Sequence, residues 1–329
     1  MKSVRAWQVV QTGEASEALE LNEVSLPEPG PGMLRVRVAA CGIGLPDLLM
    51  CRGSYPLTPK LPFTPGQELV GTVTAVGEGC AARPGERVMA VSGFFLGHGG
   101  FADEALALDD FAFRAPNTLS DAEASGFLIP YHTAYIGLLR RARLERGETL
   151  LVLGGAGGTG SAAVQLGKAI GANVIATAGG DEKATFCRKL GADDVIDYHH
   201  EDIAELVRDL TDGEGADVIY DAVGGTAFKA ASECIAHEGR LLLVGFASGG
   251  WGVPNAGHMA NHNYSVMGVM PSGYDRNFRE EAQEQLIEHH TAGRIRVPID
   301  REVPFEKIAD GLEELARGTV RGKLVLTVQ

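Results

Sequence analysis

A glycine-rich turn between an apolar strand and a helix is the feature that most restricts the fold of this chain. The run TLLVLG (149–154) is followed by GAGGTGSAAVQLGKAIGA, which contains the spacing G-x-G-x-x-G. Glycine permits the sharp turn, and the free N–H groups at the helix start face an anion such as a pyrophosphate. The turn therefore predicts dinucleotide binding, with a purely structural glycine turn as the alternative. The residues predicted to contact the cofactor here are Gly155, Gly157, Gly158, Thr159 and Gly160.

The segment 122–270 has the pattern of a doubly wound α/β domain. Apolar runs without alternation recur between helical segments, as a parallel sheet covered on both faces requires. The predicted strands are 149–154, 173–178, 193–198, 216–225, 239–246 and 264–270. A helix is expected to start at the cap candidates Ser120 and Asp121 and to continue through DAEASGFLIPYHTAYIGLLRRA.

The flanking segments have a different texture. Residues 1–121 contain short alternating runs such as MLRVRVAAC, separated by proline-rich links, which indicate an antiparallel and partly barrel-like unit. Residues 271–329 contain two helices and a final strand, GKLVLTV. We expect this tail to complete the N-terminal domain, although a small third unit is an alternative.

Composition excludes several classes of partner. The 329 residues carry a net charge of −14 and have a pI of about 5.1, which disfavours nucleic acid and anionic membranes. No uninterrupted apolar run approaches ~18 residues, and the N-terminus lacks a signal-peptide pattern. The five cysteines are odd in number and widely spaced, which favours reduced thiols and a cytoplasmic location.

The end of the second predicted strand favours NADP(H) over NAD(H). An NAD-binding domain usually carries a carboxylate at this position for the ribose 2′-hydroxyl. Here the strand ends in Ala178 and Gly179, and Asp181 comes late. Lys183 follows, and Tyr198 closes the next strand, so a 2′-phosphate is the better match. The alternative is that Lys183 is only a solvated helix residue and that selectivity is loose.

Several motifs in the same order carry a family resemblance over nearly the full length. They include CGIGLPDLLMCRGSYP, LPFTPGQELVGTVTAVG, GHGGFADEALAL, YHTAYIGLL, the glycine turn, DAVGG and GKLVLTV. The chain resembles the medium-chain dehydrogenases/reductases, and within them the zinc-independent, zeta-crystallin-like NADPH:quinone oxidoreductases. The resemblance implies a GroES-like, partly open β-barrel domain (1–121 and 271–329) and a Rossmann domain (122–270). It also implies a homodimer formed through the edge strand at 264–270.

The zinc ligands of the related alcohol dehydrogenases are replaced in this sequence. The resemblance aligns Gly44, Gln67 and Ile129 with the three ligand positions, and none of them is a good zinc ligand. Asp47 and Glu68 remain nearby, but we expect them to be structural. The cysteine lobe of a structural zinc is also missing, and the pair His258 and His262 lacks a third ligand, so no metal is predicted.

Without a metal, an acceptor that delocalises its own charge is favoured. Hydride addition to a quinone or an enone gives a phenolate or enolate, which hydrogen bonds and a proton from water can accommodate. The resemblance implies that Tyr55 donates a hydrogen bond to the acceptor, and the alternative is that Tyr55 is a loop aromatic packed on the barrel. It also implies contacts to the cofactor from Gly44, Thr133, Val223, Gly224, Gly245, Phe246, Ala247 and Lys323. A pocket lined by Phe94, Phe95, Ile129 and Met270 is a further expectation, with core packing as the alternative.

Two other functions stay open from the sequence. One is an enoyl reductase acting on an α,β-unsaturated carbonyl or thioester, and the other is an NADPH-binding structural protein with little turnover. An α/β-hydrolase is excluded because GFASG misplaces the serine of G-x-S-x-G.

Overall fold

The computed structural model describes residues 2–328 and divides into two compact units. Unit 1 contains residues 1–129 and 297–329, and unit 2 contains residues 130–296. The chain was expected to divide at 121/122 and 270/271, so the boundaries differ. Both differences have a local cause. Helix α3 (Asp121–Ser125) packs on strands β3 (Met33–Ile43), β4 (Glu68–Val76) and β14 (Lys323–Thr327) of unit 1. Helix α10 (Arg276–Thr291) instead hydrogen-bonds to α4 (Leu128–Tyr135) within unit 2.

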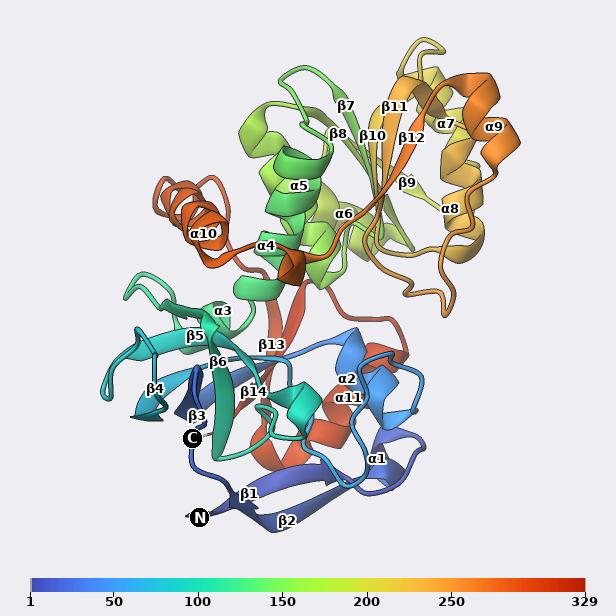
Figure 1. Ribbon diagram of the computed structural model, residues 1–329. Coiled ribbons are helices and arrows are strands. Elements are labelled where there is room, and N and C mark those ends of the chain that lie inside the picture. The colour runs from blue at the N-terminus through green and yellow to red at the C-terminus, as the bar shows by residue number, and fades with distance from the viewer. Residues whose placement is uncertain (1, 329) are drawn as a thin grey trace. The chain divides into compact units, whose positions relative to one another are not determined.

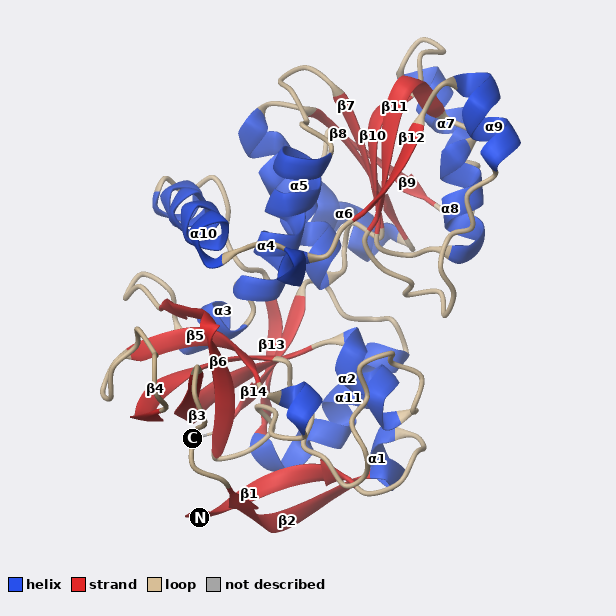
Figure 2. Ribbon diagram, in the orientation of Figure 1, coloured by secondary structure: helices blue, strands red, loops and turns tan. Residues whose placement is uncertain are grey.

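Unit 2 is built on a six-stranded parallel sheet in the order β12-β11-β10-β7-β8-β9 (Figure 1). Figure 2 shows that helices flank this sheet, with α5 on one side and α7 and α8 on the other. The strands are β7 (Thr149–Leu153), β8 (Asn173–Ala178), β9 (Asp194–Asp197), β10 (Ala216–Asp221), β11 (Ile235–Leu243) and β12 (Ser265–Gly268). The helices between them are α5 (Gly158–Ile170), α6 (Asp181–Lys189), α7 (Ile203–Leu210), α8 (Gly225–Ser232) and α9 (Ala256–His262). The doubly wound Rossmann sheet predicted from the apolar runs is therefore confirmed.

Strand and helix ends were predicted less well than the elements themselves. The run 216–225 was expected to be one strand, but β10 ends at Asp221 and Val223 and Gly224 lie in the following turn. The long helix expected from Ser120 is also interrupted. The Ser120 cap is present, with its Oγ accepting from the Glu123 N–H at 3.2 Å, but α3 ends at Ser125, with Gly126 as its C-cap, and a new helix starts at Leu128.

Unit 1 contains the barrel-like sheet expected from its alternating runs. Its order is β13-β14-β3-β4-β5-β6, and β3 also pairs with β6, which closes the last four strands on themselves. The strands are β3 (Met33–Ile43), β4 (Glu68–Val76), β5 (Arg87–Ser92), β6 (Glu104–Arg114), β13 (Ile299–Pro304) and β14 (Lys323–Thr327). A separate antiparallel hairpin, the helices and two short 3₁₀ turns complete the unit: β1 (Lys2–Val9), β2 (Leu19–Leu26), α1 (Ala15–Ala18), α2 (Leu45–Cys51), α11 (Ile308–Ala316), Phe94–Leu96 and Phe305–Lys307.

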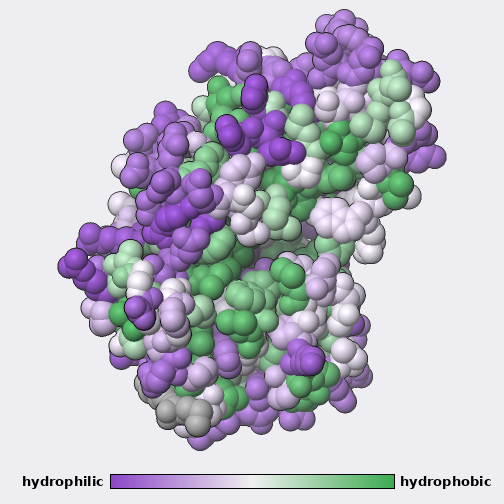
Figure 3. Space-filling view, in the orientation of Figure 1, coloured by the Kyte–Doolittle hydropathy of each residue, from purple (hydrophilic) through white to green (hydrophobic). Residues whose placement is uncertain are grey.

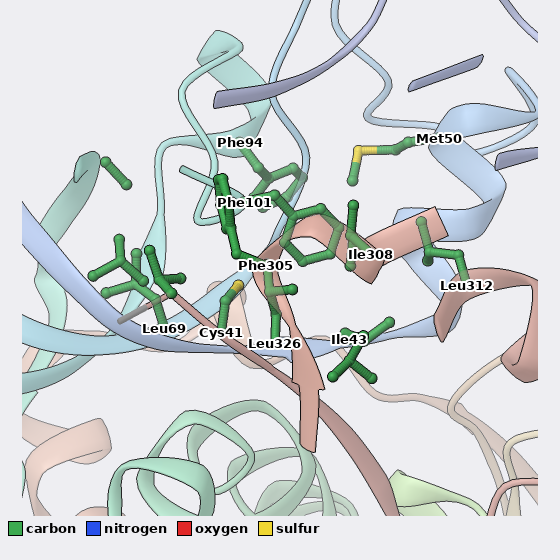
Figure 4. Packing of buried hydrophobic residues seen from close by; sticks show 14 of the residues in the cluster. Cys41, Ile43, Met50, Leu69, Phe94, Phe101, Phe305, Ile308, Leu312 and Leu326 are labelled. Atoms are coloured by element: carbon green, nitrogen blue, oxygen red, sulfur yellow. The ribbon is translucent and has the colours of Figure 1, made fainter. Parts of the chain in front are cut away.

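The C-terminal segment contributes directly to the core of unit 1 (Figure 4). Leu326 of β14 and Ile308 and Leu312 of α11 are fully buried in the same core cluster as Phe101. Because β14 pairs antiparallel with β3, in the register Leu324 opposite Ile43, this tail is a structural part of the barrel.

The surface carries both hydrophilic and apolar side chains. On the face shown in Figure 3, hydrophilic side chains separate smaller apolar patches. No helix within residues 2–328 is long and apolar enough to span a membrane.

Candidate active site

The glycine turn forms a tight cradle at the start of α5. Gly154 has a positive φ of 69°, and Gly157 is the N-cap of the helix. A Cβ atom on Gly160 would lie 2.2 Å from the Gly154 carbonyl oxygen, so only glycine fits there. The helix therefore starts immediately beside the end of β7, and its unpaired N–H groups can donate hydrogen bonds to an anion there. Gly155, Gly157, Gly158, Thr159 and Gly160 are all brought to this turn.

A second cradle lies where β8 and β9 end. A Cβ atom on Gly179 would lie 2.7 Å from the Tyr198 hydroxyl and 2.6 Å from His199 Nε2. The two rings pack at 4.6 Å, and Tyr198 is 47% exposed. Lys183 follows in the first turn of α6. The predicted 2′-phosphate residues Gly179 and Tyr198 therefore come together, and they are joined by His199, which the sequence analysis missed.

The next two strand ends are organised by Asp221. Its Oδ1 accepts hydrogen bonds from the N–H groups of Val223 and Gly224, both at 2.8 Å. Burial raises the pKa of this carboxyl, and the two backbone donors oppose the rise. Gly224 has a positive φ of 72°, and a Cβ atom there would meet the Gly250 carbonyl oxygen at 2.2 Å. Val223 and Gly224, two predicted cofactor residues, thus lie in a turn that is held in one conformation.

The loop that follows β11 contains three of the predicted cofactor residues. Gly245 and Ala247 donate backbone hydrogen bonds to the 221–222 turn, and the Phe246 ring packs at 4.7 Å from Trp251. Thr133 lies on α4 and is only 7% exposed. The neighbouring His132 is buried and bonds through Nε2 to Gln283 Oε1 at 2.7 Å, and burial lowers its pKa to about 4.

In unit 1 the carboxylates nearest to the replaced zinc-ligand positions are taken up by protein hydrogen bonds. Asp47 accepts from Gly44 N and Gly66 N, both at 2.9 Å, through different oxygens. Glu68 Oε1 lies 2.5 Å from Lys323 Nζ. Its second oxygen accepts from Ile129 N at 3.0 Å. Both carboxylates therefore already have partners on both oxygens.

The residues present do not fit a catalytic zinc ion. Glycine and isoleucine supply no ligand atom, an amide is a poor one, and a catalytic zinc needs three protein ligands. The Cys41 thiol, which is close by, is directed to the Glu68 carbonyl oxygen at 3.0 Å. Within residues 2–328 no group of three His, Cys, Asp or Glu side chains is arranged to hold a metal ion.

The remaining residues singled out from the sequence have varied surroundings in the structure. Lys323 was expected to reach the cofactor; within unit 1 its ammonium group has Glu68 as partner, and the cofactor contact stays a prediction. Phe94 is 6% exposed and belongs to the barrel core, as the alternative for it proposed. Phe95 and Met270 are exposed, at 39% and 63%. The His258 ring stacks on that of His262 at 4.0 Å.

Comparison with known proteins decides the family. Residues 30–117 match the alcohol dehydrogenase GroES-like domain, and residues 158–288 match the family described as zinc-binding dehydrogenase. The quinone oxidoreductase-like protein 2 homolog of Nematostella vectensis is 34% identical over 332 residues, which cover 99% of this chain and 90% of that protein. The chain belongs to the medium-chain dehydrogenase/reductase superfamily.

Solved superfamily members share the whole fold. The quinone oxidoreductase of Escherichia coli, complexed with NADPH, has a TM-score of 0.91 and 28% identity over 98% of this chain and 100% of its own. A mycobacterial protein complexed with NADPH also has a TM-score of 0.91 and is 28% identical, over 99% of this chain and 100% of its own. The superfamily and the α/β fold expected from the sequence are thus confirmed.

Proposed function

We propose that this protein is a zinc-independent oxidoreductase that uses NADPH to reduce a quinone or another conjugated carbonyl compound. The observation that carries the proposal is the state of the ligand positions in unit 1. Glycine, glutamine and isoleucine occupy them, and the two nearby carboxylates are taken up by backbone donors and by Lys323. A reaction that depends on a Lewis-acidic zinc ion has no ligand set here.

The residues of unit 2 fit NADP(H). The N–H groups at the start of α5 would hold the pyrophosphate, because they are unpaired and carry the positive end of the helix dipole. Lys183, Tyr198 and His199 would hold the 2′-phosphate, because the Asp197 carboxylate at this turn already accepts from the N–H groups of Gly180 and His199, both at 3.1 Å. Thr133 and the turns after β10 and β11 would position the remaining part of the cofactor. When bound, the reduced nicotinamide supplies a hydride ion, that is, two electrons and one proton.

The residues of unit 1 determine which acceptor suits the protein. Reduction of a simple ketone concentrates negative charge on one oxygen, whereas reduction of a quinone or enone spreads it over a conjugated system. Tyr55 is partly buried against the barrel core, and burial raises the pKa of its phenol, so the hydroxyl keeps its proton at neutral pH. It would donate a hydrogen bond to the acceptor oxygen, which afterwards takes a proton from water.

The test is a panel of acceptors on purified protein whose metal content has been measured. Oxidation of NADPH is followed with 1,4-benzoquinone, with 2-cyclohexenone, with an enoyl thioester and with cyclohexanone. We expect turnover of the conjugated acceptors, no turnover of cyclohexanone and no effect of a chelator. Stoichiometric zinc together with turnover of the plain ketone would refute the proposal. Turnover of the thioester alone would favour the enoyl reductase, and tight NADPH binding without any turnover would favour the structural role.

We also propose a homodimer in the cytoplasm. Strand β12 is the end strand of the unit 2 sheet and, among the described residues, pairs only with β11, so its other edge can add a strand from a second copy. A monomeric mass in light scattering at micromolar concentration would contradict the dimer. All five cysteines are free thiols, which suits a reducing compartment.

A further inference from the structure

The side chain of Gln67 is buried with an unused hydrogen-bond donor. Only 8% of the residue is exposed, and its Nε2 makes no hydrogen bond of good geometry within the described part of the chain, although the Tyr55 hydroxyl lies beside the amide. Buried polar groups are nearly always paired in folded proteins, so an exception needs an explanation. In enzymes, unpaired donors of this kind occur where a ligand supplies the missing acceptor.

The backbone that carries Gln67 is held from several sides. Gly66 donates its N–H to Asp47 Oδ1 at 2.9 Å, and its carbonyl oxygen accepts from Ser92 Oγ at 2.6 Å and from Gly100 N at 2.8 Å. The carbonyl oxygen of Gln67 itself accepts from Ser92 N at 2.9 Å. Gly66 has a φ of +101°, and a Cβ atom there would lie 2.7 Å from the backbone nitrogen of Phe101. This segment is therefore fixed before any ligand arrives.

The amide of Gln67 lies beside the hydroxyl of Tyr55. Burial raises the pKa of this phenol, and the neighbouring amide acts against that rise. Two neutral donors, one amide N–H group and one phenol O–H group, are thus brought together from the segments on either side of the cis peptide bond between Leu61 and Pro62. A pair of fixed donors is the arrangement that stabilises an oxyanion.

We infer that the Gln67 amide donates a hydrogen bond to the carbonyl oxygen of the acceptor, together with Tyr55, and so stabilises the charge that develops there. The inference rests on the proposed function and adds a catalytic residue to it. No bond to Gln67 forms or breaks: the hydride adds to the conjugated system, the oxygen gains the negative charge, and water then protonates it. The neutral Gln67 amide thus stabilises the negative charge on the acceptor oxygen, as the zinc cation does in a zinc-dependent reaction.

The test replaces Gln67 by methionine, which keeps the length of the side chain and removes the donor. Gln8→Met is the matched control, because Gln8 lies in β1 of the same unit, is partly exposed and already has Asn22 as a partner. Loss of one oxyanion donor lowers turnover by ~10²-fold or more. We expect Gln67→Met to lose about that factor in kcat with unchanged NADPH affinity and unreduced thermal stability, and Gln8→Met to keep wild-type turnover.

A second readout does not depend on turnover. The absorption band of 4-nitrophenolate moves to shorter wavelength when its oxyanion accepts hydrogen bonds. We expect this shift on binding to the wild-type protein, and a smaller shift with Gln67→Met and with Tyr55→Phe. A wild-type band shift in Gln67→Met, or no binding of the phenolate to the wild type, would overturn the inference. A Gln67-dependent shift in a protein that reduces no acceptor would instead refute the proposed function, and with it the catalytic role, and would leave Gln67 only as a donor that binds an oxyanion.

Discussion

The buried pair between Glu68 and Lys323 allows a quantitative test of the structure of unit 1. The side chains of Glu68 and Lys323 are 4% and 9% exposed, and their charged atoms lie 2.5 Å apart. Replacing Lys323 by methionine leaves the Glu68 carboxylate buried with the Ile129 N–H as its remaining donor. Removing one partner of a buried pair typically costs ~3–5 kcal/mol. The remaining donor places the expected loss at the lower end, about 3 kcal/mol.

The double variant separates this effect from simple loss of packing. In Glu68→Gln/Lys323→Met no charge is left uncompensated, so most of the lost stability should return. Arg52→Met is the control, because Arg52 and Glu14 form an ion pair at 2.7 Å in the same unit but with 38% and 56% exposure. Exposed pairs contribute ~0–1 kcal/mol, so this control should change little.

Urea unfolding followed by tryptophan fluorescence provides the assay. The chain has two tryptophans, Trp7 in unit 1 and Trp251 in unit 2. In a Trp251→Phe background the signal reports unit 1 alone, and the free energy of unfolding comes from linear extrapolation. If Lys323→Met lost no more stability than Arg52→Met, or if the double variant were as unstable as the single one, the reasoning about the buried pair would be wrong.

Three further predictions concern unit 2. Lys183→Ala should weaken NADPH binding by about tenfold or more and leave NADH binding nearly unchanged, because a charge-assisted bond to the 2′-phosphate contributes ~1.5–3 kcal/mol. Isothermal titration measures the affinity for both cofactors, and Lys189→Ala on the same helix is the control. Equal losses of affinity for the two cofactors would contradict the assignment. Gly160→Ala should abolish cofactor binding and destabilise the protein by ~1–3 kcal/mol, since the new Cβ would lie 2.2 Å from the Gly154 carbonyl oxygen. Gly273→Ala is the control: its Cβ would meet no atom within 4 Å, so this variant should bind the cofactor normally. The pKa of His132 is about 4 in the folded protein against 6.5 for a free histidine, so its stabilising contribution is complete above pH 6.5 and is lost as the pH falls toward 4, by up to about 3 kcal/mol. His132→Gln should flatten that part of the curve of unfolding free energy against pH, measured by denaturant unfolding. An unchanged slope would show that another group titrates.

The Asp47 carboxyl should be considered when such pH curves are interpreted. Burial raises its pKa to about 6, so it opposes His132: its contribution is present at low pH and is lost as the pH rises from about 4 to 6. The two slopes partly cancel in the wild type. Only the difference between wild type and variant isolates His132.

The sequence by itself determined the local features of this protein. The glycine turn, the apolar parallel strands, the alternating strands of the barrel and the cap at Ser120 follow from backbone sterics and from the period of burial, which act over a few residues. The absence of good zinc ligands at 44, 67 and 129 could also be predicted, because ligand chemistry depends on residue type.

Only the tertiary structure decided which distant residues meet. Glu68 and Lys323 are 255 positions apart and pair because β14 lies beside β3, which in turn lies beside β4. Packing of the whole unit likewise buries the Gln67 amide beside Tyr55 without a hydrogen bond of good geometry, and the approach of β9 to β8 brings His199 to Gly179. Nothing in the sequence around these residues predicts their partners, because a buried charge or donor is satisfied by whichever group the packing of the whole chain places against it.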